Sequence, residues 1–454
     1  MRVGFVGLFC FSFICLFGQS YFYNTQQFGL KSTLLGGAVT AGSSDLSMIY
    51  YNPAALKYAR NKGFDFALFM PSYTFTSFGD KLGSGREFTD RRIALIPSLL
   101  TYKTSIGDNI NIVFSFLQKD QWDNDYRHVF TDQSNARVLK NAFSYDHQGD
   151  EKWFGVGSSI DLSENVSFGI SQFWSILSSS YEYGLSSEIQ DLNNNELDRF
   201  YSDQFDLTMS STLSMVTKLG FSYDGGENKF GVVLTTPNYL PIHKGGDLEK
   251  ATSIRDLGRR VTTNVIDFDI DPQFKNPWQV EIGYSRILPD KSTIWVKGSY
   301  HTQIQSYEVF SVDRTNLDGL IFSNGFNEVT NFAVGYAKDV SEKFQVLASA
   351  RTNFSAAYDE ANSQRNQNTI VLEQDRFHLA LGAKIAHRSS SFVVGLDYGF
   401  SHGNGNPPFQ NFPNIELLNL QDTNHRQRVI TVILTYQFFL DTMGRNISRI
   451  LDRS

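Results

Sequence analysis

The sequence predicts an all-β fold: a 14-stranded antiparallel transmembrane β-barrel with an N-terminal hatch inside its lumen. Aromatic residues make up 14 % of the chain, with 39 Phe and 21 Tyr, yet the mean hydropathy is only −0.27. No window after residue 20 holds the ~18 apolar residues that a transmembrane helix needs. A barrel instead spreads its aromatic residues along alternating strands and in girdles at the two membrane interfaces.

Residues 1–20, "MRVGFVGLFCFSFICLFGQS", have the pattern of a secretory signal peptide. A basic Arg2 precedes an apolar run, and small residues surround an expected cleavage point after Ser20. A membrane anchor helix is the alternative. Because Cys10 and Cys15 both lie in this segment, the mature chain is expected to have no cysteine, which excludes thiol catalysis and Cys-ligated metals.

Residues 21–62 do not alternate like a strand and are rich in Gly and small residues. Asn52 is expected to cap a short helix with Pro53 at its first position, where the missing N–H costs nothing. Glycines such as Gly36 and Gly37 allow tight backbone packing. We therefore expect a compact hatch that plugs the lumen, since a wide barrel leaves space that side chains do not fill. A disordered periplasmic tail is the alternative.

Residues 63–440 are expected to form the barrel. In 429–438, for example, apolar residues fall on one face and mostly small or polar residues on the other, which is the period of a strand. Short turns such as 162–165 and 288–291 alternate with long polar stretches such as 121–151, which is the outer-membrane pattern. The expected strands are 63–76, 90–106, 109–120, 152–162, 165–183, 204–224, 228–237, 275–287, 291–310, 328–340, 343–357, 374–388, 391–402 and 425–439.

Two prolines fall inside expected strands, Pro71 in the first and Pro97 in the second. Proline cannot donate to a strand ladder, so in a closed barrel both positions need an explanation. Folding the hairpin around residue 84 places them nearly opposite each other. Either their nitrogens point away from the partner strand, or the wall is locally open there and forms a lateral exit.

Several ionisable residues are expected to face the lumen, because they alternate with the apolar positions of their strands. One interpretation is that these charged groups pair with each other in a solvated interior. The alternative is that one of the cations binds the carboxylate headgroup of a ligand. The spacing in 191–198 resembles a calcium loop only at its first ligands, so no metal site is expected. These lumen residues are Glu281, Lys297, His301, Arg351, His378, Lys384 and Asp397.

Other function classes are disfavoured. The net charge of −7 gives no reason to expect nucleic-acid binding. Neither inward His has a Ser or Cys partner that the spacing identifies, so the chain is not expected to be an enzyme or to need a cofactor. A general porin is a weaker hypothesis, because a hatch would obstruct its channel.

The segment "LLGGAVTAGSSDLSMIYYNPAAL" resembles the hatch of the FadL/TodX (OMPP1) family of outer-membrane transporters for long-chain fatty acids and other hydrophobic compounds. The likeness rests on the Gly36-Gly37-Ala38 run, on Asp45, and on the motif Asn52, Pro53 and Ala54. It implies passive transport of a hydrophobic ligand, with capture at extracellular loops and lateral release through the barrel wall.

The resemblance also implies an outer-membrane location, contact with membrane lipids and lipopolysaccharide, and a monomer without cofactors. FadL-like barrels that are structural or protein-secretion partners are the alternative. The chain departs from the usual pattern at its end, because an expected periplasmic tail, 441–454, follows the final aromatic residues. The sequence does not identify the ligand, because an apolar pocket discriminates weakly among chains of similar size.

Overall fold

The structure is a computed structural model of the chain. It describes residues 22–59, 63–67, 70–79, 88–96, 99–106, 110–133, 137–191, 196–256, 259–268, 272–312, 320–357, 374–387, 390–405 and 423–439. The expected signal peptide and C-terminal tail lie outside these ranges. Within them, no helix is both long and apolar enough to cross a membrane.

The N-terminal segment contains the two short helices of the described chain, α1 (Met48–Tyr51) and the 3-10 helix η1 (Pro53–Tyr58). Pro53 is the first residue of η1, and the side chain of Asn52 accepts a hydrogen bond from the Ala54 N–H. The structure therefore has the cap that the sequence predicts, in which an Asn oxygen satisfies an N–H that the helix leaves free.

The rest of the described chain is almost entirely β-structure, in agreement with the all-β prediction. The strands are β1 (Gly63–Ala67), β2 (Met70–Phe78), β3 (Phe88–Ile96), β4 (Leu99–Ile106), β5 (Ile110–Gln133), β6 (Arg137–Asp161), β7 (Val166–Asp191), β8 (Glu196–Asp224), β9 (Asn228–Thr235), β10 (Tyr239–Asp256), β11 (Arg259–Phe268), β12 (Gln279–Ile287), β13 (Thr293–His301), β14 (Ile304–Val312), β15 (Leu320–Phe326), β16 (Val329–Ser341), β17 (Phe344–Asn353), β18 (Arg376–Ala386), β19 (Ser390–Gly405) and β20 (Thr423–Phe439).

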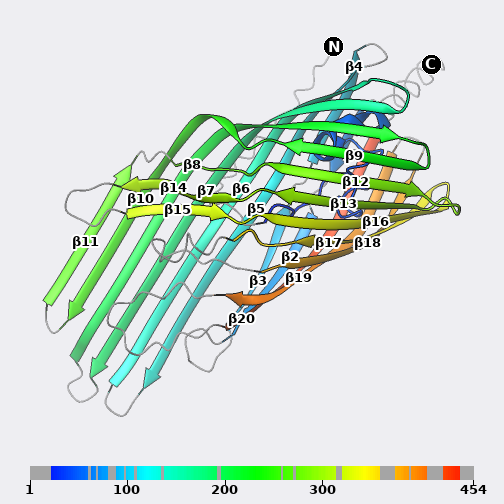
Figure 1. Cartoon of the computed structure of the whole chain (residues 1–454). Helices are drawn as coiled ribbons and strands as arrows, with labels where there is room; N and C mark the ends of the chain where they lie inside the picture. Colours follow the sequence, from blue (N-terminus) through cyan, green and yellow to red (C-terminus); the bar gives the residue numbers. More distant parts are fainter. Residues whose placement is uncertain are drawn as a thin grey trace, which may run out of the picture.

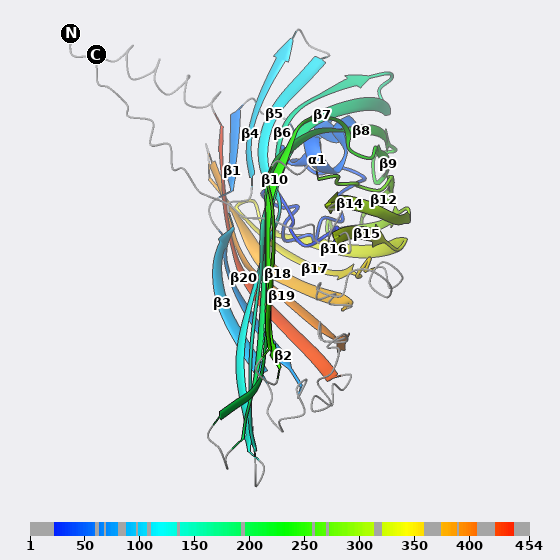
Figure 2. The same cartoon turned by 90° about the vertical axis from the view of Figure 1, so that its left-hand side faces the viewer.

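These strands form one large antiparallel sheet, and β14 and β15 form a separate hairpin. At the short-turn end the pairs follow a circuit from β1 to β4 and β5, onward through β9, β12, β13 and β16, and then to β20. Strand β20 in turn pairs with β1. Figure 2 shows the sheet curving around α1 and the chain beside it.

Strands β5 to β8 are much longer than the sequence predicts, and they run far beyond the ends of β9, β12 and β13 (Figure 1). Most of 121–151 and 184–203 and much of 238–274 pair as strands, although their polarity indicated loops. The sequence interpretation failed here because it required an apolar face. A strand that is paired on its edges but lies beyond the apolar band needs no such face.

The first two expected strands are each described in two pieces, β1 and β2 for the first and β3 and β4 for the second, because 68–69 and 97–98 lie outside the described residues. The β1–β4 ladder and the β2–β3 ladder have the same register, from Phe66 with Leu100 to Met70 with Ile96. Beyond the pair of Leu99 with Leu117, in the described chain, β3 pairs with β2 alone and β5 pairs with β6 alone. We call this stretch without a ladder, on the side away from the short turns, the gap between β3 and β5.

The two faces of the wall differ as the alternation predicts. In β20, Ile433 and Thr435 are 1 % exposed and face the N-terminal segment, whereas Ile430 on the other face is 42 % exposed. The hydroxyl of Thr435 donates to the Leu30 carbonyl at 3.4 Å. The apolar residues between these inward positions thus form the outer surface, which is the arrangement of a wall facing lipid.

Candidate functional site

The N-terminal segment is almost completely buried against the inner face of the wall, and Asn52 is a main point of attachment. Its amide Nδ2 donates to the Thr40 carbonyl at 2.7 Å and to the Phe221 carbonyl of β8 at 3.1 Å. Its Oδ1 accepts from the Ala54 N–H at 3.1 Å. One fully buried side chain therefore holds two parts of the segment together and ties both to the wall.

Glycines of the wall make this close approach possible. A Cβ at Gly169 of β7 would lie 2.3 Å from the backbone of Pro53 and Ala54, and one at Gly231 of β9 would lie 2.0 Å from the Thr40 carbonyl oxygen. No real Cβ reaches such distances, so the backbone of the segment rests directly on the backbone of the strands. A Cβ at Gly220 of β8 would lie 2.2 Å from the Asn52 Oδ1, so this glycine makes room for the capping side chain.

Asp45 organises the turn that precedes α1. Its carboxylate accepts hydrogen bonds from the backbone N–H groups of Lys31 and Ser32, each at 3.0 Å. It also accepts from the hydroxyls of Ser32 and Ser47. A buried carboxylate is tolerated only with such partners. Asp45 is therefore placed as a structural residue of the segment.

Gly36 and Gly37 both have positive φ angles, of 61° and 69°. They form a turn in which a side chain on Gly37 would overlap Gln27 and Tyr51. The Gly-Gly pair is thus explained by backbone conformation and close packing together.

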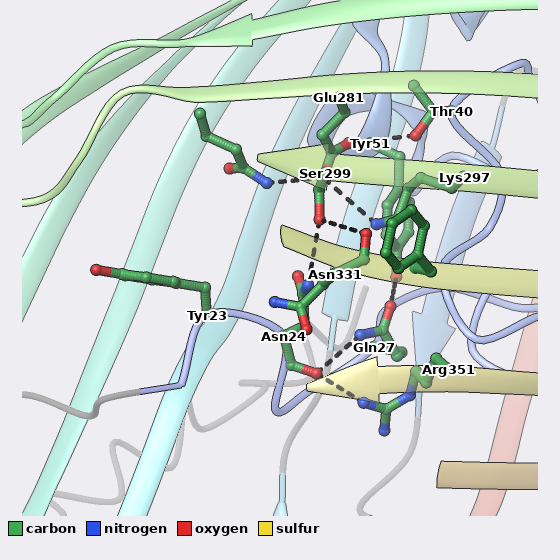
Figure 3. A network of polar contacts seen from close by, with 12 residues as sticks. Tyr23, Asn24, Gln27, Thr40, Tyr51, Glu281, Lys297, Ser299, Asn331 and Arg351 are labelled. Carbon is green, nitrogen blue, oxygen red and sulfur yellow. Dashed lines mark hydrogen bonds and ion pairs between the residues drawn. The ribbon is translucent and has the colours of Figure 1, made fainter. Parts of the chain in front are cut away.

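Five of the seven expected lumen residues form two clusters on the inner face. Figure 3 shows Glu281 and Lys297 of the first cluster and Arg351 of the second, together with residues of the segment. In the first, Lys297 of β13 lies 3.3 Å from Glu281 of β12, and both side chains are nearly inaccessible. Thr40 of the segment donates to the second oxygen of Glu281 at 3.2 Å. The pair is therefore internally satisfied and anchors the segment to β12.

The second cluster is centred on Arg351 of β17. Its guanidinium lies 2.8 Å from Asp397 and 2.9 Å from the Nδ1 of His378. It also donates to the backbone carbonyl of Asn24 at 2.7 Å. Arg351 is thus already paired with a carboxylate, so this cluster is also explained by a paired interior that holds the segment in place.

The remaining two lumen residues also face the segment. His301 stacks on Tyr23, with ring centroids 4.3 Å apart. Lys384 lies half-buried on β18, and its charge acts on Lys31 of the segment. Burial, reinforced by the positive charge of Lys384, lowers the pKa of Lys31 to about 8.

A pocket lies where the start of the segment meets the wall. Its volume is about 60 Å³, and aromatic and aliphatic side chains share its lining with about as many polar ones, including the carboxylates of Asp120 and Glu151. The Lys119 ammonium donates to the Tyr23 carbonyl at 3.2 Å at this site. The volume admits a few water molecules, so a drug-sized ligand would need residues such as Tyr23 to move. The lining residues used below are Phe22, Tyr23, Lys119, Trp122, Trp153 and His301.

One side chain bridges the gap between β3 and β5. Arg92 of β3 lies 2.5 Å from the Asp123 carboxylate and donates to the Asp125 carbonyl of β5 at 2.6 Å. Asp90 holds the same guanidinium at 2.7 Å. Because Asp123 is half-exposed, such an ion pair is worth ~0–1 kcal/mol.

Of the two prolines flagged in the sequence, the structure places Pro71 alone. It lies in β2 and is paired with Leu95 of β3, so the ladder between these strands continues past it. Pro97 lies outside the described residues, between the end of β3 and the start of β4.

Sequence reasoning missed the wall glycines, the bridge by Arg92, and the part that residues 22–27 take in the site. The wall glycines could have been found from the sequence, because Gly169, Gly220, Gly231 and Gly283 all fall at inward positions of their strands. The bridge has no such signal, because it joins strands that do not pair. Among the described residues, no group of three potential ligands is placed to hold a metal ion.

Several solved structures have a fold similar to that of this chain. The Pseudomonas putida toluene transporter TodX superimposes with a TM-score of 0.61 at 11 % identity, covering 91 % of this chain and 99 % of that one. A Pseudomonas aeruginosa FadL homologue gives 0.59 at 11 %, covering 94 % and 99 %. The monoaromatic hydrocarbon channel CymD gives 0.53 at 12 %, covering 92 % and 99 %.

The chain therefore has the fold of the FadL/TodX structures, and the resemblance seen in residues 34–56 is confirmed at the level of fold. No protein-family model matches the sequence. No curated protein sequence matches it either.

Replacing Asn52 by Ala is expected to loosen the segment without unfolding the wall. The change leaves the Thr40 and Phe221 carbonyls without a buried donor, which costs ~1–3 kcal/mol. Limited proteolysis of the folded protein should show faster cleavage within residues 22–59. Asn165→Ala, in an exposed turn, is the control, and equal protection of the two variants would contradict the assigned role of Asn52.

Replacing Gly169 by Ala should displace the segment further, because the new methyl group would overlap the backbone of Pro53. Gly298→Ala is the matched control, since its Cβ would meet only the Phe332 ring, at 3.8 Å. Thermal unfolding should show a lower transition temperature for the first variant and little change for the second. Equal stability of the two would show that the segment does not rest on the wall as described.

Proposed function

We propose that this protein is a passive outer-membrane transporter of hydrophobic small molecules, such as long-chain fatty acids or aromatic hydrocarbons. The observation that carries the proposal is the buried segment 22–59, which rests on wall glycines inside a curved sheet of FadL type. A filled interior would block an open water channel. It is what we expect of a protein that first binds its ligand and then releases it.

In this proposal the circuit of pairs from β1 to β20 closes a 14-stranded barrel, and the segment is its hatch. Residues 1–20 direct export, 21–62 form the hatch, 63–440 form the barrel, and 441–454 form a periplasmic tail. The long strands β5 to β8 then project from the cell surface, because the short turns lie at the periplasmic end. No enzyme chemistry and no cofactor are involved, and the protein acts as a monomer.

The pocket beside Phe22 and Tyr23 is the proposed ligand site. Trp122 and Trp153 supply apolar surface, and Lys119 and His301 supply polar groups that orient a ligand. The pocket is small because Tyr23 fills it by stacking on His301. Ligand entry therefore requires the start of the hatch to shift, and that shift is the proposed first step of transport.

The gap between β3 and β5 is the proposed exit into the membrane. Apolar ligands partition from such an opening into lipid without crossing water. Arg92 is the proposed latch, since its bridge to β5 crosses the gap. A bridge worth about 1 kcal/mol changes the ratio of open to closed states by about fivefold, so the latch restrains the gap without sealing it.

Binding tests the proposal directly. Purified full-length protein should bind a fluorescent long-chain fatty acid saturably, and unlabelled fatty acid should displace the probe. Trp122→Ala should weaken this binding, because it removes apolar surface from the pocket. Trp278→Ala is the control, since Trp278 is 46 % exposed. No saturable binding of the fatty acid or of toluene would contradict the transport function.

A cross-link across the gap is expected to stop transport while leaving binding intact. Arg92→Cys and Asp123→Cys can be joined by a cleavable bis-maleimide, since the mature chain is expected to have no other thiol. Ligand uptake by cells should fall on cross-linking and recover on cleavage. The Arg92→Cys variant alone, treated in the same way, is the control. Undiminished uptake in the cross-linked protein would place the exit elsewhere.

A further inference from the structure

Three arginines gather on the outer face of the wall, at the end away from the short turns. The register joins Phe400, Arg428, Phe75 and Arg91 into one row across β19, β20, β2 and β3. In the next row, His402 of β19 is paired with Arg426 of β20. The four basic residues of these two rows, Arg91, Arg426, Arg428 and His402, are all exposed.

These rows lie on the outer surface. Ile430, two residues from Arg428 on the same strand face, is 42 % exposed, and its neighbour Tyr398 is 39 % exposed. The intervening Gln427 is buried on the inner face. Strand alternation therefore directs the side chains of Arg426 and Arg428 away from the lumen.

The position along the strand matches a membrane boundary. Between Tyr436 and Arg428, eight residues of a tilted strand rise about 20 Å along the barrel axis, close to the ~25 Å height of an apolar band. The surface between them is apolar, and it ends at Phe400 and Phe75. The arginines thus lie just where an apolar surface meets the headgroup layer of the outer leaflet.

The three arginines have no carboxylate partner among the described residues, and a ring contact orients one of them. Among the described residues, no ion pair joins Arg91, Arg426 or Arg428 to a carboxylate. Arg91 lies over the Phe75 ring, 5.6 Å from its centroid, which orients the guanidinium. The carboxylate nearest along the neighbouring strand β18 is Asp375, just before its start. This carboxylate accepts a hydrogen bond from the Ser355 N–H at 3.1 Å and not from an arginine of the site.

A shallow hollow, wide open to the outside and about 510 Å³ in volume, lies over the outer face of β19 and β20 at the same place. Tyr398 and Phe400 give it an apolar lining, and Arg426, Arg428 and His402 give it a cationic one. An apolar floor beside several guanidinium groups suits an amphipathic anion. Guanidinium groups bind phosphate through paired hydrogen bonds.

We propose that Arg91, Arg426 and Arg428 form a binding site for the phosphates of lipid A, the phosphorylated glycolipid part of lipopolysaccharide. The inference rests on the outer-membrane location in the proposed function, but not on the transport mechanism. The acyl chains lie along the apolar surface below Tyr398, and the phosphates reach the guanidinium groups. This site is on the opposite face of the wall from the hatch and its pocket.

Native mass spectrometry of the purified full-length protein tests the site with lipid A as the probe. The Arg91→Gln, Arg426→Gln, Arg428→Gln triple variant should bind lipid A at least about tenfold more weakly, because it loses several charge-assisted hydrogen bonds. Arg286→Gln, an exposed arginine near the short-turn end, is the matched control and should bind like the wild type. Wild-type binding by the triple variant overturns the proposal.

A second measurement uses the unchanged protein, so it stands even if the triple variant does not fold. Lipid A should bind, and lipid A with both phosphates removed should bind at least about tenfold more weakly. Equal binding of the two lipids overturns the site, and so does displacement of lipid A by inorganic phosphate at equal concentration. Fatty-acid binding in the lumen should be unchanged by the triple variant, so failure of this site is distinguishable from failure of transport.

Discussion

The structure depends on one steric constraint, the contact of backbone with backbone between the N-terminal segment and the wall. A Cβ at Gly169 or Gly231 would collide with the main chain of the segment. The segment must therefore supply its own polar partners at these points. Asn52 does so for the Thr40 and Phe221 carbonyls. The Asn-Pro-Ala motif and the wall glycines therefore form the same contact, and each is needed for the other to fit.

The charged residues of the interior follow from the same constraint. A segment with irregular backbone exposes carbonyl groups that no strand ladder satisfies, and these need donors when they are buried. Arg351 supplies one to Asn24, and Lys119 supplies one to Tyr23. Polar contacts of this kind are individually weaker than apolar packing and can be exchanged for ligand or water. The end of the segment near Tyr23 is accordingly the part best suited to move.

Much of the fold was predictable from the sequence, because period-two alternation and the alternation of short turns with long connections are properties of the chain itself. The cap at Asn52 and the inward position of residues such as Glu281 and Arg351 followed from the same rules. The strand character of 121–151 did not, because polar strands beyond an apolar band lose the hydrophobic period. The pairing of Arg351 with Asn24 and the bridge by Arg92 also did not, since each joins residues far apart in sequence.

The central claim is that the segment 22–59 plugs the lumen and must shift for a ligand to pass. A disulfide between Leu35→Cys and Gly335→Cys tests it most directly, since the Leu35 Cβ lies 3.1 Å from the Cβ position at Gly335. This is about 0.4 Å closer than the short end of the Cβ separations found in disulfides, so the bond forms after a small shift of the segment away from β16. Uptake of a hydrophobic ligand should stop in the oxidised protein and return on reduction, with Leu35→Cys alone unaffected. Uptake that continues at the wild-type rate with the disulfide formed would contradict the account.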